Sequence, residues 1–354
     1  MGSRDEALNV NRHVVAPQRA VPIQAVVIGG CSIDYVTTAL GDVTLAECGG
    51  SAVYSAVAAR LWMEGVGIVS WRGETYPQAW IDRLQRSGID CSGVATVTGP
   101  HAVALPVRYD SMGRRQGHVP IERFEAMGIP VPEALGNAVA NWNTNVASWS
   151  DKANAAQVPD NYRNVGAVLV TTAVLRTSVR DQIRSLKAGG AAVLLDVALD
   201  PLETYTPHED QLDLKALLKD VDIFLPSESD VYACLGKTEP LKAATFFATQ
   251  GPSIVVLKRG RHGSIVFDAE SGQVHDVPVY PSKVKDPTGA GDAYCGGFLA
   301  GYLETGDPFE AALYGTVAAS YIVEEFGALY GLRYGRSDAL ERLNWLRSEL
   351  VAAG

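Results

Sequence analysis

One glycine-rich stretch, residues 286–292, constrains the fold of this chain more than any other. It reads Asp-Pro-Thr-Gly-Ala-Gly-Asp and runs directly into residues 293–303, which are apolar on nearly every face. Gly289 and Gly291 tolerate unusual backbone angles, and we expect a positive φ at Gly291. Such a turn directs several backbone N–H groups at one point, where the dipole of the next helix is also positive. The stretch therefore predicts an anion site in front of a buried helix.

Asp292 stands at the start of this predicted helix, beside the anion site. An Asp in this position is most often only an N-cap. Two glycines, a preceding Thr and an Asp six residues upstream are more than a cap requires, so we favour a second role. A carboxylate here can accept the proton of an attacking hydroxyl while the N–H groups hold the charge of a phosphoryl group.

The same stretch resembles the C-terminal signature of the ribokinase-like sugar kinases, also called the phosphofructokinase-B family. The family pattern is Asp-Thr-x-Gly-Ala-Gly-Asp; here Pro287 replaces the usual Thr and Thr288 fills the variable place. Gly49-Gly50 before an Ala-rich run is similar to the family's first signature, although alone it is equally a tight strand-to-helix turn. The resemblance covers nearly the whole chain from residue 23 onward. It implies an α/β, three-layer fold with a mostly parallel central sheet and a small β lid.

The resemblance also implies an ATP-dependent kinase that transfers the γ-phosphoryl group to a hydroxyl of a sugar or related small molecule. Its implied cofactors are ATP and Mg²⁺, and it allows a monovalent cation and a homodimer. The implied catalytic residues are Asp292, Gly289, Ala290 and Gly291. The implied substrate-binding residues are Asp34, Gly49, Gly50 and Tyr54. The implied nucleotide-binding residues are Lys258, Gly260, Thr288, Gly289, Gly291, Thr316 and Ala319, and Asp230 is the implied metal residue.

Two positions depart from the family pattern. Tyr54 stands where the family often has an Asn that holds acceptor hydroxyls, which favours an acceptor with a ring to stack on; the alternative is that Tyr54 packs in the core. Ser227 and Asp230 replace the usual Asn-x-x-Glu that serves magnesium and phosphate. Asp230 can still join a magnesium shell; the alternative is an ordinary helix N-cap with acidic residues in its first turn.

Strand-like and helix-like segments alternate along most of the chain, as in a parallel sheet covered on both faces. Expected strands are 23–28, 66–71, 167–171, 192–196, 222–225, 253–258, 264–268 and 274–279. Expected helices are 51–63, 77–88, 178–188, 212–219, 229–235, 241–250, one from Asp292, 308–325 and one from Ser337. We expect residues 1–22 to be a disordered tail and residues 23–354 to form one kinase domain, with the lid from 31–48 and 93–121. Residues 122–164 suggest only a helix near 132–142.

The composition limits the partners. A formal net charge of −10 argues against nucleic acid or an anionic membrane, since both select basic surfaces. The five cysteines are widely spaced and contain no Cys-x-x-Cys pair, which favours reduced thiols and a cytoplasmic location. No apolar run reaches membrane-spanning length, and residues 1–22 lack a signal-peptide core.

Other functions have weaker support in the sequence. The chain has no Walker A pattern, no G-x-S-x-G elbow and no zinc-ligand spacing of its histidines. A dinucleotide-binding oxidoreductase would need G-x-G-x-x-G after the first strand, where this chain has Gly29-Gly30-Cys31-Ser32. A binding protein that has lost catalysis is disfavoured by the intact Gly289, Gly291 and Asp292. The acceptor stays open among sugars, sugar acids and nucleosides, with Tyr54 favouring a nucleoside or cyclic sugar.

Overall fold

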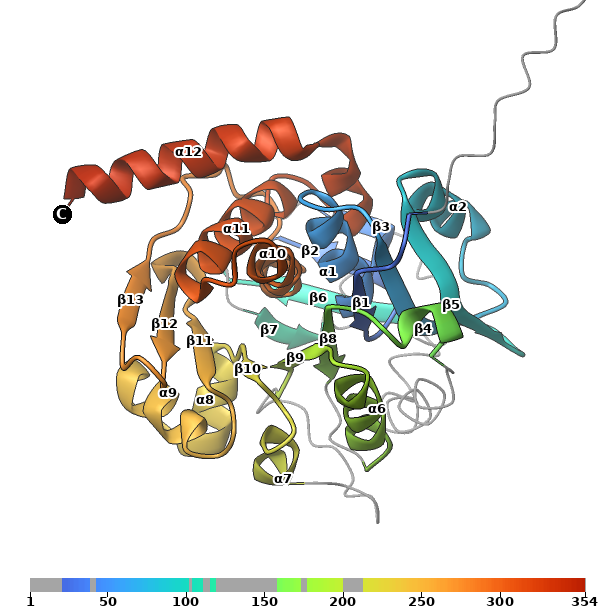
Figure 1. The fold of residues 1–354 in the computed structure, drawn as a ribbon. Coiled ribbons are helices and arrows are strands. Elements are labelled where there is room, and N and C mark those ends of the chain that lie inside the picture. Colours follow the sequence, from blue (N-terminus) through green and yellow to red (C-terminus); the bar gives the residue numbers. More distant parts are fainter. Residues whose placement is uncertain are drawn as a thin grey trace, which may run out of the picture.

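A nine-stranded sheet forms the centre of the molecule, with the strand order β13-β12-β11-β10-β9-β8-β1-β4-β5 (Figure 1). The computed structural model describes residues 21–38, 43–101, 104–110, 115–118, 158–172, 177–199 and 213–353. The strands are β1 (Ala25–Ile28), β4 (Val66–Gly73), β5 (Ile89–Val97), β8 (Ala167–Thr172), β9 (Ala192–Val197), β10 (Ile223–Phe224), β11 (Ile254–Lys258), β12 (Ser264–Asp268) and β13 (Val274–Val277). All neighbours from β5 to β11 pair in parallel, and β11, β12 and β13 pair antiparallel.

Both faces of the sheet are buried at its centre, where β1 and the first four residues of β8 and β9 are apolar. In β1, Ala25 and Val27 pack into one core while Val26 and Ile28 pack into the other. Successive side chains of a strand point to opposite faces, so a run of four apolar residues supplies two cores at once. This pattern confirms the fold class expected from the sequence.

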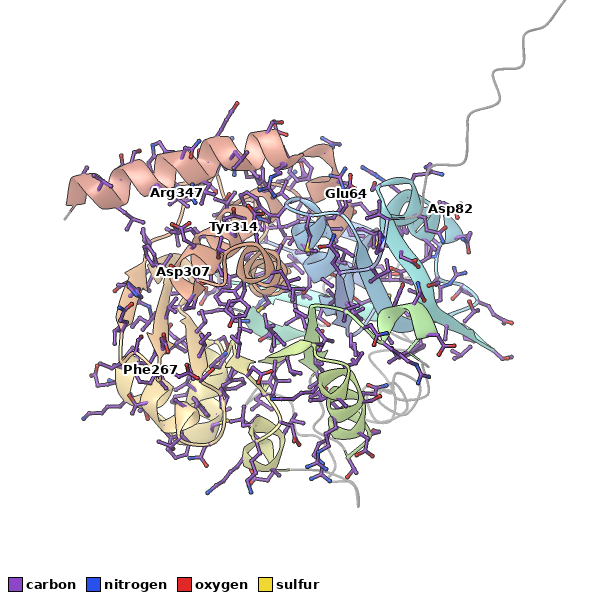
Figure 2. All side chains as sticks on the ribbon, in the orientation of Figure 1. Glu64, Asp82, Phe267, Asp307, Tyr314 and Arg347 are labelled. Atoms are coloured by element: carbon purple, nitrogen blue, oxygen red, sulfur yellow. The ribbon has the colours of Figure 1, made fainter. Side chains whose placement is uncertain are left out.

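Helices cover the two faces separately (Figure 1). One face carries α1 (Ser51–Arg60), α2 (Gln78–Arg86), α10 (Ala290–Thr305), α11 (Pro308–Ile322) and α12 (Arg336–Ala353), and the other carries α6 (Thr177–Ala188), α7 (Leu214–Leu218), α8 (Glu228–Leu235) and α9 (Pro240–Ala248). Short 3₁₀ helices lie at η1 (Asp160–Tyr162), η2 (Gly260–His262) and η3 (Ala328–Arg333). Figure 2 shows Arg347 on α12 above α11, where its guanidinium pairs with Glu310 at 2.6 Å. Every helix expected outside residues 122–164 is present within a few residues of its predicted ends.

A second sheet lies apart from the first and has the order β3-β2-β6-β7. Its strands are β2 (Ser32–Thr37), β3 (Val43–Gly49), β6 (Ala104–Tyr109) and β7 (Arg115–His118). β2 pairs antiparallel with β3 and parallel with β6. We refer to this four-stranded sheet as the lid. Residues 93–97 were expected in the lid, but they form the end of β5 and pair with β4 in the main sheet, from Gly93 opposite Val69 to Val97 opposite Gly73.

Helix α10 is enclosed on all sides, which explains its uniformly apolar sequence. It packs against α1 on one flank and α11 on the other. A β-carbon built at Gly296 would lie 2.0 Å from the carbonyl oxygen of Ser55 on α1, and one at Gly297 would lie 2.7 Å from that of Tyr314 on α11. Glycine at these two positions therefore lets the three helices approach closely and fixes where α10 begins.

Some expectations fall on residues outside the described ranges, namely the tail at 1–20 and the helix near 132–142. Within the part of the chain that the structure describes, no helix is both long and apolar enough to cross a membrane.

Candidate active site

The glycine-rich turn leads into α10, as expected, but the strained glycine is Gly289 rather than Gly291. Gly289 is the N-cap of α10 and has a left-handed φ of 74°. A β-carbon there would lie 2.3 Å from the ring of Tyr54, whereas one at Gly291 would meet only the ammonium of Lys258, at 3.6 Å. The expectation of a positive φ at Gly291 is therefore wrong: this residue already belongs to the first helical turn, and its missing side chain leaves space rather than relieving strain.

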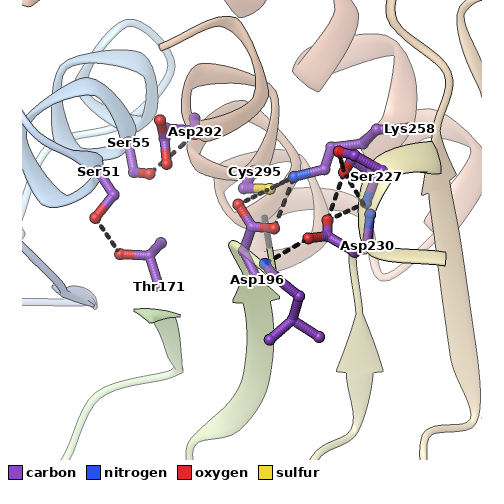
Figure 3. Close-up of polar contacts among 11 residues, drawn as sticks. Ser51, Ser55, Thr171, Asp196, Ser227, Asp230, Lys258, Asp292 and Cys295 are labelled. Atoms are coloured by element: carbon purple, nitrogen blue, oxygen red, sulfur yellow. Dashed lines mark hydrogen bonds and ion pairs between the residues drawn. The ribbon is translucent and has the colours of Figure 1, made fainter. Parts of the chain in front are cut away.

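Asp292 is also in the first turn of α10, and its carboxylate is half-buried. Its carbonyl oxygen accepts a hydrogen bond of 2.9 Å from the Ser55 hydroxyl, which anchors the turn to α1 (Figure 3). Burial, and then the negative charge of Asp196, raise the pKa of Asp292 to about 7, while Lys258 opposes the rise. A carboxyl group with a pKa near neutrality is suited to accept a proton at physiological pH.

Asp34 lies on the lid strand β2 and is buried. Ser32 donates a hydrogen bond of 2.5 Å to its Oδ1, and the Tyr54 hydroxyl approaches its Oδ2 at 3.4 Å. A β-carbon at Gly49 would lie 1.9 Å from the same carboxylate, so glycine is required there by close approach. The negative charge of Asp34 also raises the pKa of Asp292. The fold thus brings together two acidic groups that are far apart in sequence.

Tyr54 lies between Asp34 and the glycine-rich turn. It is 2% exposed, so the expected alternative of a packed side chain holds. Its ring lies against Gly289 of the anion turn while its hydroxyl points to Asp34. The residue therefore contacts both the proposed acceptor carboxylate and the proposed phosphate turn.

The first signature forms the junction between β1, the lid and α1. Gly50 is the N-cap of α1 with a φ of 100°, and a β-carbon there would lie 2.3 Å from the carbonyl oxygen of Gly30. Ser51, the next residue, accepts hydrogen bonds from the Gly30 N–H at 3.2 Å and from the Thr171 hydroxyl at 2.7 Å (Figure 3). These contacts fix α1 at the carboxyl ends of β1 and β8, which is the edge where open α/β sheets bind ligands.

A buried charged cluster, which the sequence reasoning did not identify, lies beside the turn. The Lys258 ammonium forms an ion pair of 2.7 Å with Asp196 and lies 3.3 Å from the Cys295 sulfur (Figure 3). Asp196 is near the end of β9 and Lys258 ends β11. The sequence predicts Lys258 only as a nucleotide-binding residue. The missed signal was an Asp after four apolar residues, in Ala-Val-Leu-Leu-Asp.

Asp230 forms an N-terminal capping box on α8. Ser227 is the N-cap, and its backbone N–H and hydroxyl donate to Asp230 Oδ2 at 2.7 and 2.5 Å. The backbone N–H of Leu199 donates to Oδ1 at 2.8 Å. The carboxylate therefore has a complete structural role as a cap, which was the expected alternative. Its part in magnesium binding stays a prediction.

The remaining residues expected to bind the nucleotide lie on η2, on α11 and in the turn before α10. Gly260 has a φ of 53° and begins η2 after β11. Thr316 and Ala319 lie on α11, which packs along α10. Thr288 donates from its hydroxyl and its backbone N–H to Asp286 Oδ1, at 2.6 and 2.9 Å. Contact of these residues with a nucleotide stays a prediction.

Residues 136–333, more than half of the chain, match the model of the pfkB family carbohydrate kinases. The chain belongs to this family. It is therefore an ATP-dependent kinase that transfers a phosphoryl group to a hydroxyl of a sugar or a related small molecule, as the sequence motifs predicted.

Relatives and neighbours of this kinase include enzymes named for sugars and for nucleosides. A cytidine kinase of Thermococcus kodakarensis is 28% identical over 309 residues, which are 86% of this chain and 98% of the relative. Ribokinase of Arabidopsis thaliana, solved with ribose and ATP, has a TM-score of 0.63 at 20% identity and covers 91% of this chain and 99% of its own. A nucleoside kinase of Burkholderia thailandensis, solved with inosine, has a TM-score of 0.64 at 16% identity and covers 91% and 98%. These two structures confirm the fold.

The two glycines of the turn are expected to respond differently to alanine. Gly291→Ala places a methyl group in the space of the anion site at an ordinary contact distance, so the kinase should fold and lose most of its turnover. Gly289→Ala combines a positive φ with a clash against Tyr54, so it should also lower the melting temperature. Thermal melts beside a kinase assay measure both effects. A fully active Gly291→Ala variant would show that this space does not receive phosphate.

Proposed function

We propose that this kinase phosphorylates a nucleoside or a cyclic sugar, that Asp34 binds neighbouring hydroxyls of the acceptor, and that Asp292 is the catalytic base. The observation that carries the proposal is the position of Tyr54, whose hydroxyl meets Asp34 and whose ring lies against Gly289. An ionised carboxylate accepts hydrogen bonds from two adjacent hydroxyls, and such charge-assisted bonds are stronger than neutral ones. Tyr54 is buried, so it supports the proposal by holding Asp34 beside the phosphate turn, with its ring packed against Gly289.

In the proposed mechanism, Asp292 takes the proton of the acceptor hydroxyl as its oxygen forms the new bond to the γ-phosphorus. The bond from that phosphorus to the bridging oxygen of ATP breaks, and ADP leaves. The backbone N–H groups of Gly289, Ala290 and Gly291 stabilise the charge on the transferring group at the start of α10. No covalent intermediate on the protein is required, because positioning and electrostatics supply the catalysis.

ATP and Mg²⁺ are the proposed cofactors. The start of α10 and the unobstructed space at Gly291 fit a phosphate group. Within the described ranges, no group of three or more His, Cys, Asp or Glu side chains is arranged to hold a metal ion. Magnesium usually keeps several waters and binds through substrate phosphates and one or two carboxylates. We therefore propose that it enters with ATP, with Asp230 as the protein residue assigned to it.

A monovalent cation is part of the same proposal. Asp286 is 1% exposed, and its Oδ2 has no hydrogen-bond partner. Burial raises the pKa of Asp286, and the acidic Glu47 and Glu325 add to the rise. A buried carboxylate oxygen without a partner is costly unless it is protonated or neutralised, so Asp286 would hold a cation that stabilises the turn from outside the anion site.

We also propose a homodimer and a cytoplasmic location, neither of which changes the proposed mechanism. A homodimer through the lid is supported by β3, an edge strand that carries the exposed Leu45. A cytoplasmic location is supported by the five cysteines, all of which are free thiols.

The acceptor is tested first. ADP formation by the wild-type kinase should be measured against cytidine, inosine, adenosine, ribose, fructose and an open-chain sugar acid. We expect the highest kcat/KM with an acceptor that contains a ring. A clear preference for the open-chain acid would contradict the proposed class of acceptor.

Asp34→Asn should raise the KM of the preferred acceptor by roughly tenfold to a hundredfold, since it removes the charge from one or two hydrogen bonds. The KM of ATP should stay nearly unchanged. Tyr54→Phe is the matched variant, because it keeps the ring against Gly289 and removes only the hydroxyl next to Asp34. If Asp34→Asn weakens ATP and leaves the acceptor unaffected, the acceptor site has been misplaced.

The rate should depend on pH through Asp292. Its pKa is raised to about 7, and a base acts only when it is deprotonated, so kcat should fall as pH drops below about 7. Asp292→Asn should lower turnover by roughly 10²–10⁴ with ATP binding retained. The folded state favours the neutral carboxyl group, so this variant should not lose stability above pH 7. Near-normal turnover of Asp292→Asn would reject the assigned role.

Asp286→Asn should remove the activation of the kinase by KCl, because it keeps the shape of the side chain but not its charge. Initial rates in KCl and in choline chloride at equal ionic strength measure the effect. Asp160→Asn is the matched control, since Asp160 forms an exposed pair with Arg163. Equal stimulation of wild type and Asp286→Asn would contradict the cation site.

A further inference from the structure

We propose that Lys258 donates a hydrogen bond to the transferring γ-phosphoryl group and that Asp196, a positioning residue, aims the ammonium at it. This inference rests on the proposed function, and it assigns a role to Asp196 and a specific phosphate to Lys258. It concerns the buried cluster formed by Asp196 on β9, Lys258 on β11 and Cys295 on α10.

The hydrogen-bonding capacity of Lys258 is the first argument. An ammonium has three N–H donors. One reaches Asp196 at 2.7 Å and one reaches the Cys295 sulfur at 3.3 Å. Lys258 is 9% exposed, and within the described chain its third donor has no partner. A buried ammonium with an unused donor is expected to have an acceptor during function, because an unsatisfied polar group inside a protein is costly.

The location of the ammonium is the second argument. It lies 3.6 Å from the point where a β-carbon of Gly291 would stand. That point is in the first turn of α10, where the helix dipole already favours an anion. A positive side chain and a positive helix end repel one another unless an anion lies between them. The space left by Gly291 is where such an anion fits.

The chemistry of the ion pair is the third argument. A buried ion pair contributes little net stability, because removing two charges from water costs about as much as their attraction returns. Asp196 raises the pKa of Lys258 despite its burial, so the side chain stays an ammonium through the transfer and keeps its proton. The cluster therefore supplies a fixed positive charge beside the transferring phosphoryl group. It does not supply a second base.

Binding of ATP and ADP separates this role from general nucleotide binding. In isothermal titration without acceptor, the wild-type kinase should bind MgATP and MgADP with different Kd values. Lys258→Met should weaken MgATP by about tenfold or more and leave MgADP within about twofold, because a charge-assisted bond to the third phosphate is lost. Lys187→Met is the matched control, since Lys187 forms an exposed pair with Asp222. Equal weakening of both nucleotides, or of neither, would overturn the proposal.

A second variant guards against misfolding. Lys258→Met alone leaves Asp196 buried without its partner, so the double variant Asp196→Asn/Lys258→Met removes both charges. We expect it to melt near the wild-type temperature and still to bind MgATP no better than the single variant. If the balanced double variant recovers the wild-type affinity for MgATP, Lys258 acts only by neutralising Asp196.

The pH profile adds a readout that a purely structural pair would not give. Lys258 lowers the pKa of Asp292, whereas Asp196 and Asp34 raise it. Asp230 and Cys295 act on the pKa of Lys258 itself. Lys258→Met should therefore shift the acidic limb of kcat to higher pH and lower kcat by roughly 10²–10³. Asp196→Asn should shift the limb to lower pH. Shifts in the same direction, or an unchanged kcat in Lys258→Met, would reject the proposal.

The proposed function and the role of Lys258 can be rejected by different results. If no acceptor in the panel is phosphorylated, the proposed acceptor is wrong, yet the contrast between MgATP and MgADP still tests Lys258. If an acceptor is phosphorylated and Lys258→Met keeps both its kcat and its preference for MgATP, the inference fails while the proposed function stands.

Discussion

The close contact between α1 and α10 is the constraint on which the site depends. Gly296 brings α10 against the carbonyl of Ser55, and the Ser55 hydroxyl in turn binds the carbonyl of Asp292. One turn earlier, Gly289 takes a left-handed φ and lets the ring of Tyr54 lie directly against the chain. A larger side chain at either glycine would push α10 away from α1. The start of α10, and with it the N–H groups offered to phosphate, would then move relative to Asp34.

This geometry gathers more negative than positive charge. Besides burial, Asp196 and Asp34 raise the pKa of Asp292, and Lys258 is the cation that opposes them. Burial raises the pKa of carboxyl groups, and nearby like charges raise it further. The result is a base that titrates near neutrality and an ammonium that cannot lose its proton. A site of this charge favours a nucleotide that arrives with its own magnesium over a bare polyphosphate.

The sequence predicted the fold and the turn well, because both follow from local patterns. The alternation of strand-like and helix-like segments indicated a sheet covered on both faces, and the glycines before α10 indicated an anion turn. It did less well where the answer lay in contacts between distant segments. Residues 93–97 continue β5 because they pair with residues 69–73 of β4. The positive φ falls on Gly289, where the Tyr54 ring packs against the chain. The pair of Asp196 and Lys258 joins residues on β9 and β11, and no spacing rule in the chain connects them.

Asp230 contacts two different elements of the fold. Its carboxylate receives the N–H of Leu199 and both donors of Ser227, so it orders the end of β9 as well as the start of α8. Asp196 lies on that same strand, three residues before Leu199, and the charge of Asp230 raises the pKa of both Asp196 and Lys258. The capping box thus stabilises the strand end that presents Asp196 to Lys258. A carboxylate held in this way can influence the phosphoryl site through the position of β9 and through its charge, whether or not it also meets the metal.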